Sequence, residues 1–169
     1  MKFFFEHLKN LRALYLNQLQ MLLSAEEQIA IASLDMIEQS TNQELKGALE
    51  MHKGETELQI ARLKQILTAA NGSATLVKCK AIHALIAETE DMLLDARNDT
   101  VRDVALIAAA QRIEHFEIAA YGAVRRFAQI LGDSAAAELL TETIEEKGNA
   151  DQLLTAIAER LNVDATQPA

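Results

Sequence analysis

Residues 101–131 read VRDVALIAAAQRIEHFEIAAYGAVRRFAQIL. Two neighbouring stripes at helical spacing run through this stretch, and most of their positions are apolar. They are Val104, Ile107, Glu114, Ile118, Tyr121 and Val124, and Leu106, Ala110, Ile113, Glu117, Ala120 and Phe127. A helix that is apolar on more than one face lies in the middle of an assembly. The stretch therefore predicts a central helix, in which Glu114 and Glu117 stand at positions that the helical period reserves for apolar side chains.

Four further helical patterns flank the central one, and short polar turns separate them. The patterns cover residues 5–39, 43–70, 76–96 and 134–161. Thr41 with Glu44, and Thr100 with Asp103, have the spacing of a capping box, and Ser134 can cap the last helix. Gly72 is expected to end the second helix in the left-handed conformation.

The lengths of the connections predict how these helices are arranged. Tight turns join the first two and the last two long helices, so each pair is expected to form an antiparallel hairpin. Residues 73–98 then connect the hairpins, which is the crossover topology of ferritin-like bundles. The predicted fold is all-α: a ferritin-like antiparallel four-helix bundle with an additional shorter crossover helix between the two hairpins. Residues 1–162 are expected to form a single domain, and residues 163–169 a flexible C-terminal tail.

The composition of the chain indicates its fold class, the partners it is not expected to bind, and its cellular compartment. Its only proline is Pro168, and good helix formers dominate. The net charge of −9 argues against nucleic acid as a partner, because phosphate binding needs a basic face. No apolar stretch reaches the ~20 residues that cross a bilayer, so no membrane partner is expected. Cys79 is the only cysteine, which favours a reducing compartment and a cytoplasmic location.

Charged or polar side chains interrupt the apolar stripe of each long helix. Buried carboxylates from different helices repel one another unless they are paired or bind metal. Di-metal sites in bundles use a Glu from each of two helices and a Glu/His pair at i, i+3 from each of the other two. His52/Glu55 and Glu114/Glu117 have this spacing. The set predicts a site for two divalent metal ions held by Glu26, His52, Glu55, Glu114, Glu117 and Glu146.

Each of these residues also has a structural interpretation. Glu26 could belong to a solvated helix face, and His52 could be a hydrogen-bonded core histidine. A buried Glu–His or Glu–Arg pair without metal could explain any single site. The register favours a common site, because folding each hairpin about its turn brings the predicted ligands roughly level. Tyr121 is expected to be a core aromatic with its hydroxyl hydrogen-bonded, or alternatively the partner of a Glu ligand.

Three stretches resemble the bacterial YciE/YciF stress-protein family of the ferritin-like superfamily, in particular its YciF branch. They are Ser24–Gln28, Glu55–Thr56 with Gln59–Ile60, and Val101–Gly132, whose Glu-His-Phe-Glu at 114–117 is also similar to the third-helix metal motif of rubrerythrins. The resemblance covers about Leu11 to Leu161. It implies a ferritin-like fold, a homodimer and a di-metal site that holds iron, with manganese as the alternative. It implies no known reaction.

The chain departs from the superfamily pattern in two places. His52-x-x-Glu55 reverses the common Glu-x-x-His order. In the last helix, Gly148 and Asn149 stand three residues after Glu145 and Glu146, where a His is expected. Alignment of the apolar positions favours Glu146 over Glu145 as the ligand, and Asp151 is a further carboxylate one turn on. The second metal ion is therefore expected to have fewer protein ligands than the first.

Two functions remain open from the sequence. One is a di-metal centre that reacts with peroxide or dioxygen at open metal positions, which would make the protein a non-haem oxidoreductase. The other is a non-catalytic structural or interaction protein that retains the ferritin-like fold with a degraded metal site. In the second case Phe3, Phe4 and Phe5 could supply a dimer or partner surface.

Overall fold

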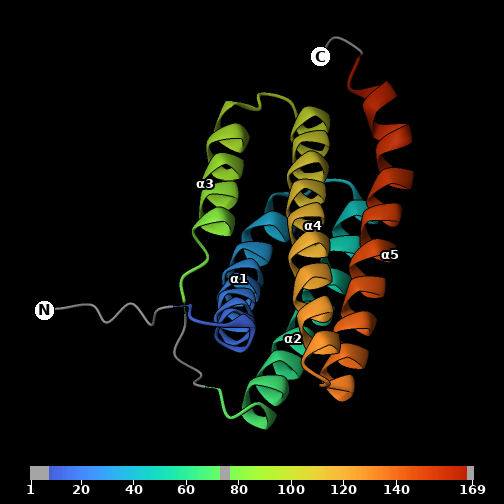
Figure 1. Cartoon of the computed structure of the whole chain (residues 1–169). Coiled ribbons are helices and arrows are strands. Elements are labelled where there is room, and N and C mark those ends of the chain that lie inside the picture. The colour runs from blue at the N-terminus through green and yellow to red at the C-terminus, as the bar shows by residue number, and fades with distance from the viewer. Residues whose placement is uncertain (1–7, 73–76, 167–169) are drawn as a thin grey trace, which may run out of the picture.

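The structure is a computed structural model that describes residues 8–72 and 77–166. Within these ranges the chain forms five α-helices and no strand (Figure 1). The helices are α1 (Leu11–Gln39), α2 (Gln43–Ala69), α3 (Lys80–Asp95), α4 (Asp99–Ile130) and α5 (Ser134–Asp164). The all-α class is therefore confirmed. The predicted surface at Phe3, Phe4 and Phe5 lies outside the described residues.

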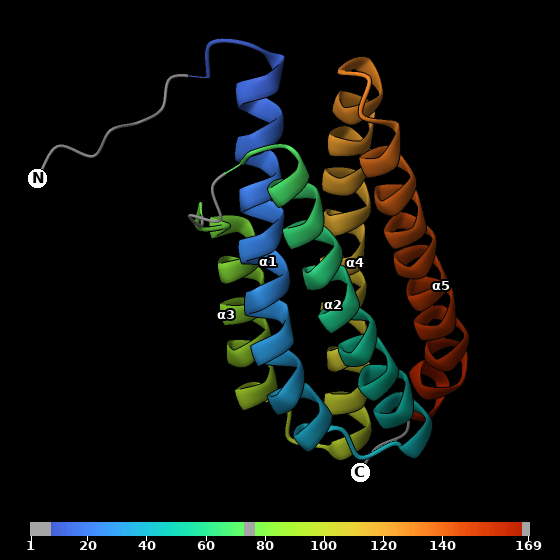
Figure 2. The ribbon, with the colours of Figure 1, turned by 90° about the horizontal axis from the view of Figure 1, so that it is seen from below.

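The four long helices pack side by side as two hairpins. α1 packs along α2, and α4 packs along α5, each pair joined by a short turn (Figure 1, Figure 2). α4 also contacts α1 and α3, and α2 contacts α5. α4 thus has neighbours on three sides, in agreement with the two apolar stripes of its sequence. None of the helices in the described part of the chain combines the length and apolar character needed to cross a membrane.

Two apolar clusters fill the space between the long helices, and a polar layer separates them. One cluster includes Leu19, Leu67 and Val124, and the other includes Leu45, Leu106 and Ile157. Between them along each helix lie the buried polar residues Glu26 on α1, Thr56 and Gln59 on α2, Glu114 and Glu117 on α4, and Thr143 and Lys147 on α5. The fold therefore holds these polar groups in the middle of the bundle, with an apolar cluster on each side.

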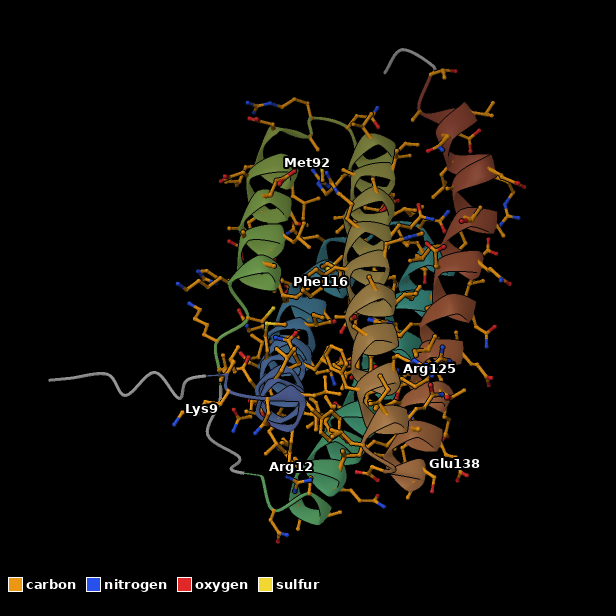
Figure 3. The ribbon with its side chains drawn as sticks, viewed as in Figure 1. Lys9, Arg12, Met92, Phe116, Arg125 and Glu138 are labelled. Carbon is orange, nitrogen blue, oxygen red and sulfur yellow. The ribbon has the colours of Figure 1, made fainter. Side chains whose placement is uncertain are left out.

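α3 covers one side of α1 and α4. Ile82 on α3 packs with Ile29 and Ile113, and Phe116 lies against this cluster, between α3 and α4 (Figure 3). Cys79 is the N-cap of α3 and is also buried here, with its N–H donated to the hydroxyl of Ser24 at 3.2 Å. The thiol is therefore part of the core under α3.

Both predicted capping boxes are wrong in detail, and the reason is a contact between the two hairpins. Asn42 caps α2 and Asn98 caps α4, in each case through the side-chain oxygen. Asp103 instead accepts from the Thr41 N–H at 2.9 Å, the Thr41 hydroxyl at 2.7 Å and the Asn42 N–H at 2.9 Å. The first turn of α4 thus holds the α1–α2 turn. The cap of α5 is Asp133 rather than Ser134.

Replacing Asp103 with Ala is expected to lower the free energy of unfolding by about 2 kcal/mol, because it leaves two backbone N–H groups without a charged acceptor. Urea unfolding followed by circular dichroism measures the change. Asp99→Ala is the matched control, since Asp99 is exposed one turn before Asp103 in the same helix and forms an ion pair with Arg102. It should cost less than about 1 kcal/mol. Equal losses in the two variants would contradict the bridging role of Asp103.

The helix ends differ from the predicted ones by a few residues. α3 begins at Lys80 rather than 76, and α5 continues to Asp164. After α2 the left-handed residue is Asn71, at φ 52°, rather than Gly72. A Cβ on Gly72 would come within 3.1 Å of the side chains of Leu16 and Leu67, so a larger residue there would require these side chains to shift slightly.

Candidate functional site

The centre of the polar layer is the ammonium group of Lys147. Its Nζ lies 2.7 Å from Glu117 Oε2 and 3.2 Å from Glu26 Oε1. All three side chains are 0% exposed. They come from α5, α4 and α1, so the ion pairs join the two hairpins across the core. A fully buried lysine is rare unless its charge is paired, and both partners here are carboxylates.

Lys147 was not among the predicted site residues, although the sequence contains the signal. The apolar stripe of α5 runs through Leu140, Ile144, Leu154 and Ile157. Position 147 lies three residues after Ile144 and seven before Leu154, so a charged residue there interrupts the stripe as Glu26 does in α1. Glu146, which was predicted instead, lies one position to the side.

The charges of this cluster depend on one another. Burial lowers the pKa of Lys147, but the carboxylates of Glu117 and Glu26 more than offset this and hold the pKa above its usual range. Burial and the charge of Glu26 raise the pKa of Glu117 well above its usual value, against the opposing effect of Lys147. Because its own pKa lies above the usual range, Lys147 stays an ammonium.

Tyr121 donates its hydroxyl proton to Glu26 Oε1 at 2.6 Å. Its ring also lies 5.9 Å from Lys147 Nζ. Burial, followed by the charges of Glu26 and Glu117, raises the pKa of Tyr121 well above its usual value, so the phenol keeps the proton that it donates. The expected core aromatic with a bonded hydroxyl is present, and its partner is one of the predicted Glu residues.

His52 and Glu114 form a second buried pair beside the first. His52 Nδ1 lies 3.0 Å from Glu114 Oε1. Burial and the charge of Lys147 lower the pKa of His52 to about 3. Burial raises the pKa of Glu114 to about 7, and Glu26 adds to the effect. Below about pH 6.5 the proton of this pair thus belongs to Glu114, and the imidazole of His52 is neutral.

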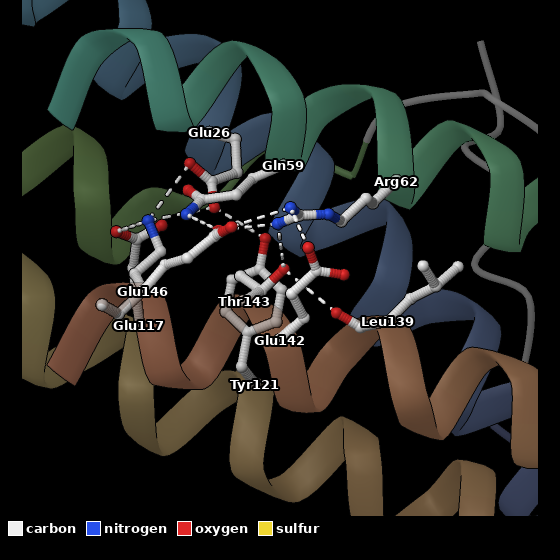
Figure 4. Close-up of polar contacts among 10 residues, drawn as sticks. Glu26, Gln59, Arg62, Glu117, Tyr121, Leu139, Glu142, Thr143 and Glu146 are labelled. Carbon is white, nitrogen blue, oxygen red and sulfur yellow. Dashed lines mark hydrogen bonds and ion pairs between the residues drawn. The ribbon is translucent and has the colours of Figure 1, made fainter. Parts of the chain in front are cut away.

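Arg62 holds Glu146 at the edge of the polar layer. Its guanidinium contacts both carboxylate oxygens of Glu146, at 2.6 and 2.7 Å, and Gln59 donates to Oε2 at 2.9 Å (Figure 4). Burial raises the pKa of Glu146, but the hydrogen bonds from Arg62 and Gln59 lower it more, to below its usual value. Glu146 is therefore an ionised partner of α2. Neither Arg62 nor Gln59 was predicted as a site residue.

The remaining predicted residues lie at the periphery. Glu55 is half-buried, and burial and the charge of Glu146 raise its pKa. Glu145 is exposed. Asp151 bonds to Gln111 and His115 on α4 rather than reaching the centre. His115 is mostly exposed, because it follows Glu114 directly and so points about 100° away from it around the helix.

Several buried oxygen atoms around the ammonium lack a partner. Among the described residues, no hydrogen-bond donor reaches Glu114 Oε2, Glu117 Oε1, Gln59 Oε1 or Thr56 Oγ1. The cavity next to His52 and Glu114 has a volume of about 10 Å³. That is barely room for one water molecule. The polar layer is thus rich in acceptors, closely packed and centred on one cation.

The donors, as they are arranged, do not fit a pair of divalent metal ions. Lys147 Nζ takes the position between Glu26 and Glu117 that a bridged cation would need. Glu146 is bound to Arg62. In the described ranges, His, Cys, Asp and Glu side chains form no group of three or more that could hold a metal ion. Metal binding by the six predicted residues stays a prediction, and it requires Lys147 to move aside.

Comparison with known proteins identifies the family of the chain. Residues 10–166 match the family described as "Domain of unknown function (DUF892)". The chain belongs to the DUF892 family. It is also 37% identical over 153 residues to Protein YciF of Escherichia coli strain K12, which covers 90% of this chain and 92% of that protein. The resemblance to YciF that the sequence motifs indicated is therefore confirmed.

Solved structures of relatives of this DUF892 chain share its fold. The crystal structure of the E. coli stress protein YciF matches with a TM-score of 0.86 and 36% identity, over 90% of this chain and 97% of that chain. YcfI from Rhodopseudomonas palustris, described as a proposed structural protein, matches with a TM-score of 0.87 and 36% identity, over 90% of this chain and 98% of that chain. A Xanthomonas campestris protein shares the fold at 21% identity, over 91% of this chain and 94% of that chain, with a TM-score of 0.74.

Proposed function

We propose that this protein is a non-catalytic structural member of the YciF-like stress proteins, with a ferritin-like bundle whose core is neutralised by lysine instead of metal. The observation that carries the proposal is the contact of Lys147 Nζ with Glu117 at 2.7 Å and with Glu26 at 3.2 Å. A covalently attached ammonium supplies the positive charge that the buried carboxylates need. It can neither change its oxidation state nor offer a coordination position to an oxidant.

The packing around the ammonium supports the absence of catalysis. A peroxide-consuming centre needs space for its substrate beside the reactive groups. The cavity against His52 and Glu114 is about 10 Å³, whereas hollows of about 570 and 670 Å³ lie elsewhere, at the α4–α5 turn and beside Met92. The description of YcfI as a proposed structural protein is consistent with this role.

A homodimer remains part of the proposal. Ile31 and Leu34 lie one turn apart on α1 and are 73% and 58% exposed. Exposed apolar side chains on one helix face offer a surface that a second copy could cover.

The unpartnered carboxylate oxygens favour a second candidate, a divalent metal ion bound at the same carboxylates once Lys147 has swung aside. Glu114 and Glu117 each have one buried oxygen without a donor among the described residues. When bound, an iron or manganese ion would supply Lewis-acid and redox chemistry towards peroxide or dioxygen. Glu26, Glu114 and Glu117 would hold it, and Tyr121 would keep Glu26 oriented.

The metal content of the purified protein decides between the two candidates. The protein should be expressed with iron and manganese in the medium, beside a Glu114→Ala/Glu117→Ala double variant. We expect well under one equivalent of either metal in both proteins, no peroxide consumption, and a Tm of the native protein that a chelator does not change. About two equivalents in the native protein, lost in the double variant, would overturn the proposal in favour of the di-metal site.

A further inference from the structure

We infer that Lys147 is the resident occupant of a cation site, and that a small divalent cation with a preference for oxygen ligands takes the place of its ammonium once the side chain is shortened. The inference rests on the proposed function and extends it. In this view the carboxylates of the polar layer form a binding site for one cation. In the native protein that cation is the ammonium of Lys147, and in a variant with a shorter side chain it is a metal ion from solution.

The contacts of the ammonium define the site. Glu26 approaches Nζ from α1, which lies across the bundle from α5, and Glu117 approaches it from α4, the hairpin neighbour of α5. Tyr121 fixes Glu26 by donating to its Oε1 at 2.6 Å. Tyr121 therefore still holds Glu26 when Lys147 is shortened. Among the described residues the carboxylate of Glu117 has no polar contact other than Lys147, so it is free to turn towards a cation in the newly opened space.

The surrounding atoms indicate which cation fits. Glu117 Oε1 and Gln59 Oε1 are buried without a donor among the described residues, although their side chains are 0% and 1% exposed. Gln59 belongs to the same polar layer, where its amide N–H donates to Glu146 (Figure 4). Carboxylate and amide oxygens are the ligands that Mg²⁺, Mn²⁺ and Ca²⁺ prefer, and Co²⁺ accepts the same ligands. No thiol belongs to this group, because Cys79 lies under α3.

The opposing interpretation is that Lys147 and the two Glu residues are simply a buried ion pair. In that case the carboxylates would take up protons when the ammonium is removed, as isolated buried carboxyl groups do. A variant without the ammonium would then show no affinity for metal. The two interpretations therefore predict different metal affinities for the folded variant, and this affinity can be measured without any assay of activity.

The experiment titrates Co²⁺ into Lys147→Ala, following visible absorption, the bound metal per chain and the Tm. We expect about one Co²⁺ per chain, bound at least about 100-fold more tightly than by the native protein, and a Tm that rises with Co²⁺ concentration. Lys64→Ala, which removes an exposed lysine on α2, should behave like the native protein. Adding Glu117→Gln to Lys147→Ala should abolish binding. A folded Lys147→Ala protein whose absorption and Tm ignore Co²⁺ would overturn the inference.

Lys147→Ala could fail to fold without metal, and this outcome is also informative. Refolding from urea with and without Co²⁺ then replaces the titration, with helical circular dichroism as the readout. Recovery that requires Co²⁺ and is absent when Glu117 is also Gln supports the inference, whereas failure to recover with Co²⁺ overturns it. Metal in the native protein would instead contradict the proposed function, so the two failures are distinguishable.

Discussion

Lys147→Met is expected to lower the free energy of unfolding by about 3–5 kcal/mol, because it leaves buried carboxylates without their counter-ion. Methionine keeps nearly the shape of the lysine side chain and removes only the charge, so the loss reports electrostatics rather than a cavity. Urea unfolding at neutral pH measures it. Since whole domains unfold at about 5–15 kcal/mol, the variant should be close to its folding limit.

Two further variants separate the charge from other effects of the substitution. Lys64→Met removes an exposed ammonium that lies 3.4 Å from Glu27 and should change stability by less than about 1 kcal/mol. Adding Glu26→Gln and Glu117→Gln to Lys147→Met neutralises the cluster and should restore much of the loss, because the contributions of contacting residues are not additive. A Lys147→Met protein as stable as Lys64→Met would show that the ammonium is not buried between the carboxylates.

His52→Gln and Glu114→Gln are expected to give the protein opposite dependences of stability on pH. The pKa of Glu114 is raised to about 7 from 4.5, so its contribution to stability is complete below pH 4.5 and is lost as the pH rises to 7. The pKa of His52 is lowered to about 3 from 6.5, so its contribution is complete above pH 6.5 and is lost as the pH falls towards 3.

In the native protein the pH dependence of stability from Glu114 and that from His52 cancel between pH 4.5 and 6.5. The unfolded chain holds one proton on His52 in this range, and the folded protein holds one on Glu114. Folding moves the proton from one residue to the other without net uptake. His52→Gln leaves only Glu114, so its stability should fall as the pH rises. Glu114→Gln leaves only His52, so its stability should rise with pH, in each case by up to about 1.4 kcal/mol per pH unit.

Urea midpoints of the three proteins at several pH values across this range provide the test. Groups that do not interact with His52 or Glu114 contribute equally to all three proteins, so the differences in slope report this pair and its buried neighbours. Parallel curves for the native protein and both variants would show that His52 and Glu114 do not exchange a proton on folding. A native protein that follows the Glu114→Gln curve would show that neither His52 nor Glu114 holds the proton in the folded state.

The helices could be predicted well from the sequence, but the partners of their ends could not. Apolar periodicity places all five helices because burial of one face follows directly from residue spacing. Capping boxes depend on which acceptor is nearest in three dimensions. Thr41 and Asp103 are both good cap residues, yet they bond to each other across 62 positions. Nothing local to either residue indicates that contact.

The site shows the same limit. Interruption of an apolar stripe correctly places Glu26, Glu114 and Glu117 in the core, and His52 beside them. The same criterion applied to α5 indicates Lys147, whereas a di-metal site requires a carboxylate, which selects the adjacent Glu146. A lysine at position 147 of α5 decides whether the buried carboxylates face an ammonium or could face a metal ion. The apolar spacing of α1, α2 and α4 is the same in both cases, so it cannot distinguish them.

The division of the polar layer between the hairpins has a consequence for the order of assembly. Glu117 and Lys147 belong to the second hairpin and can meet when α4 closes on α5, whereas Glu26 arrives only when the first hairpin docks. Until then the Glu117–Lys147 ion pair is expected to keep the exposed face of the second hairpin hydrated. Because the last of these contacts forms after most of the chain is compact, it should act mainly by slowing unfolding. Lys147 is then expected to affect the unfolding rate more than the folding rate.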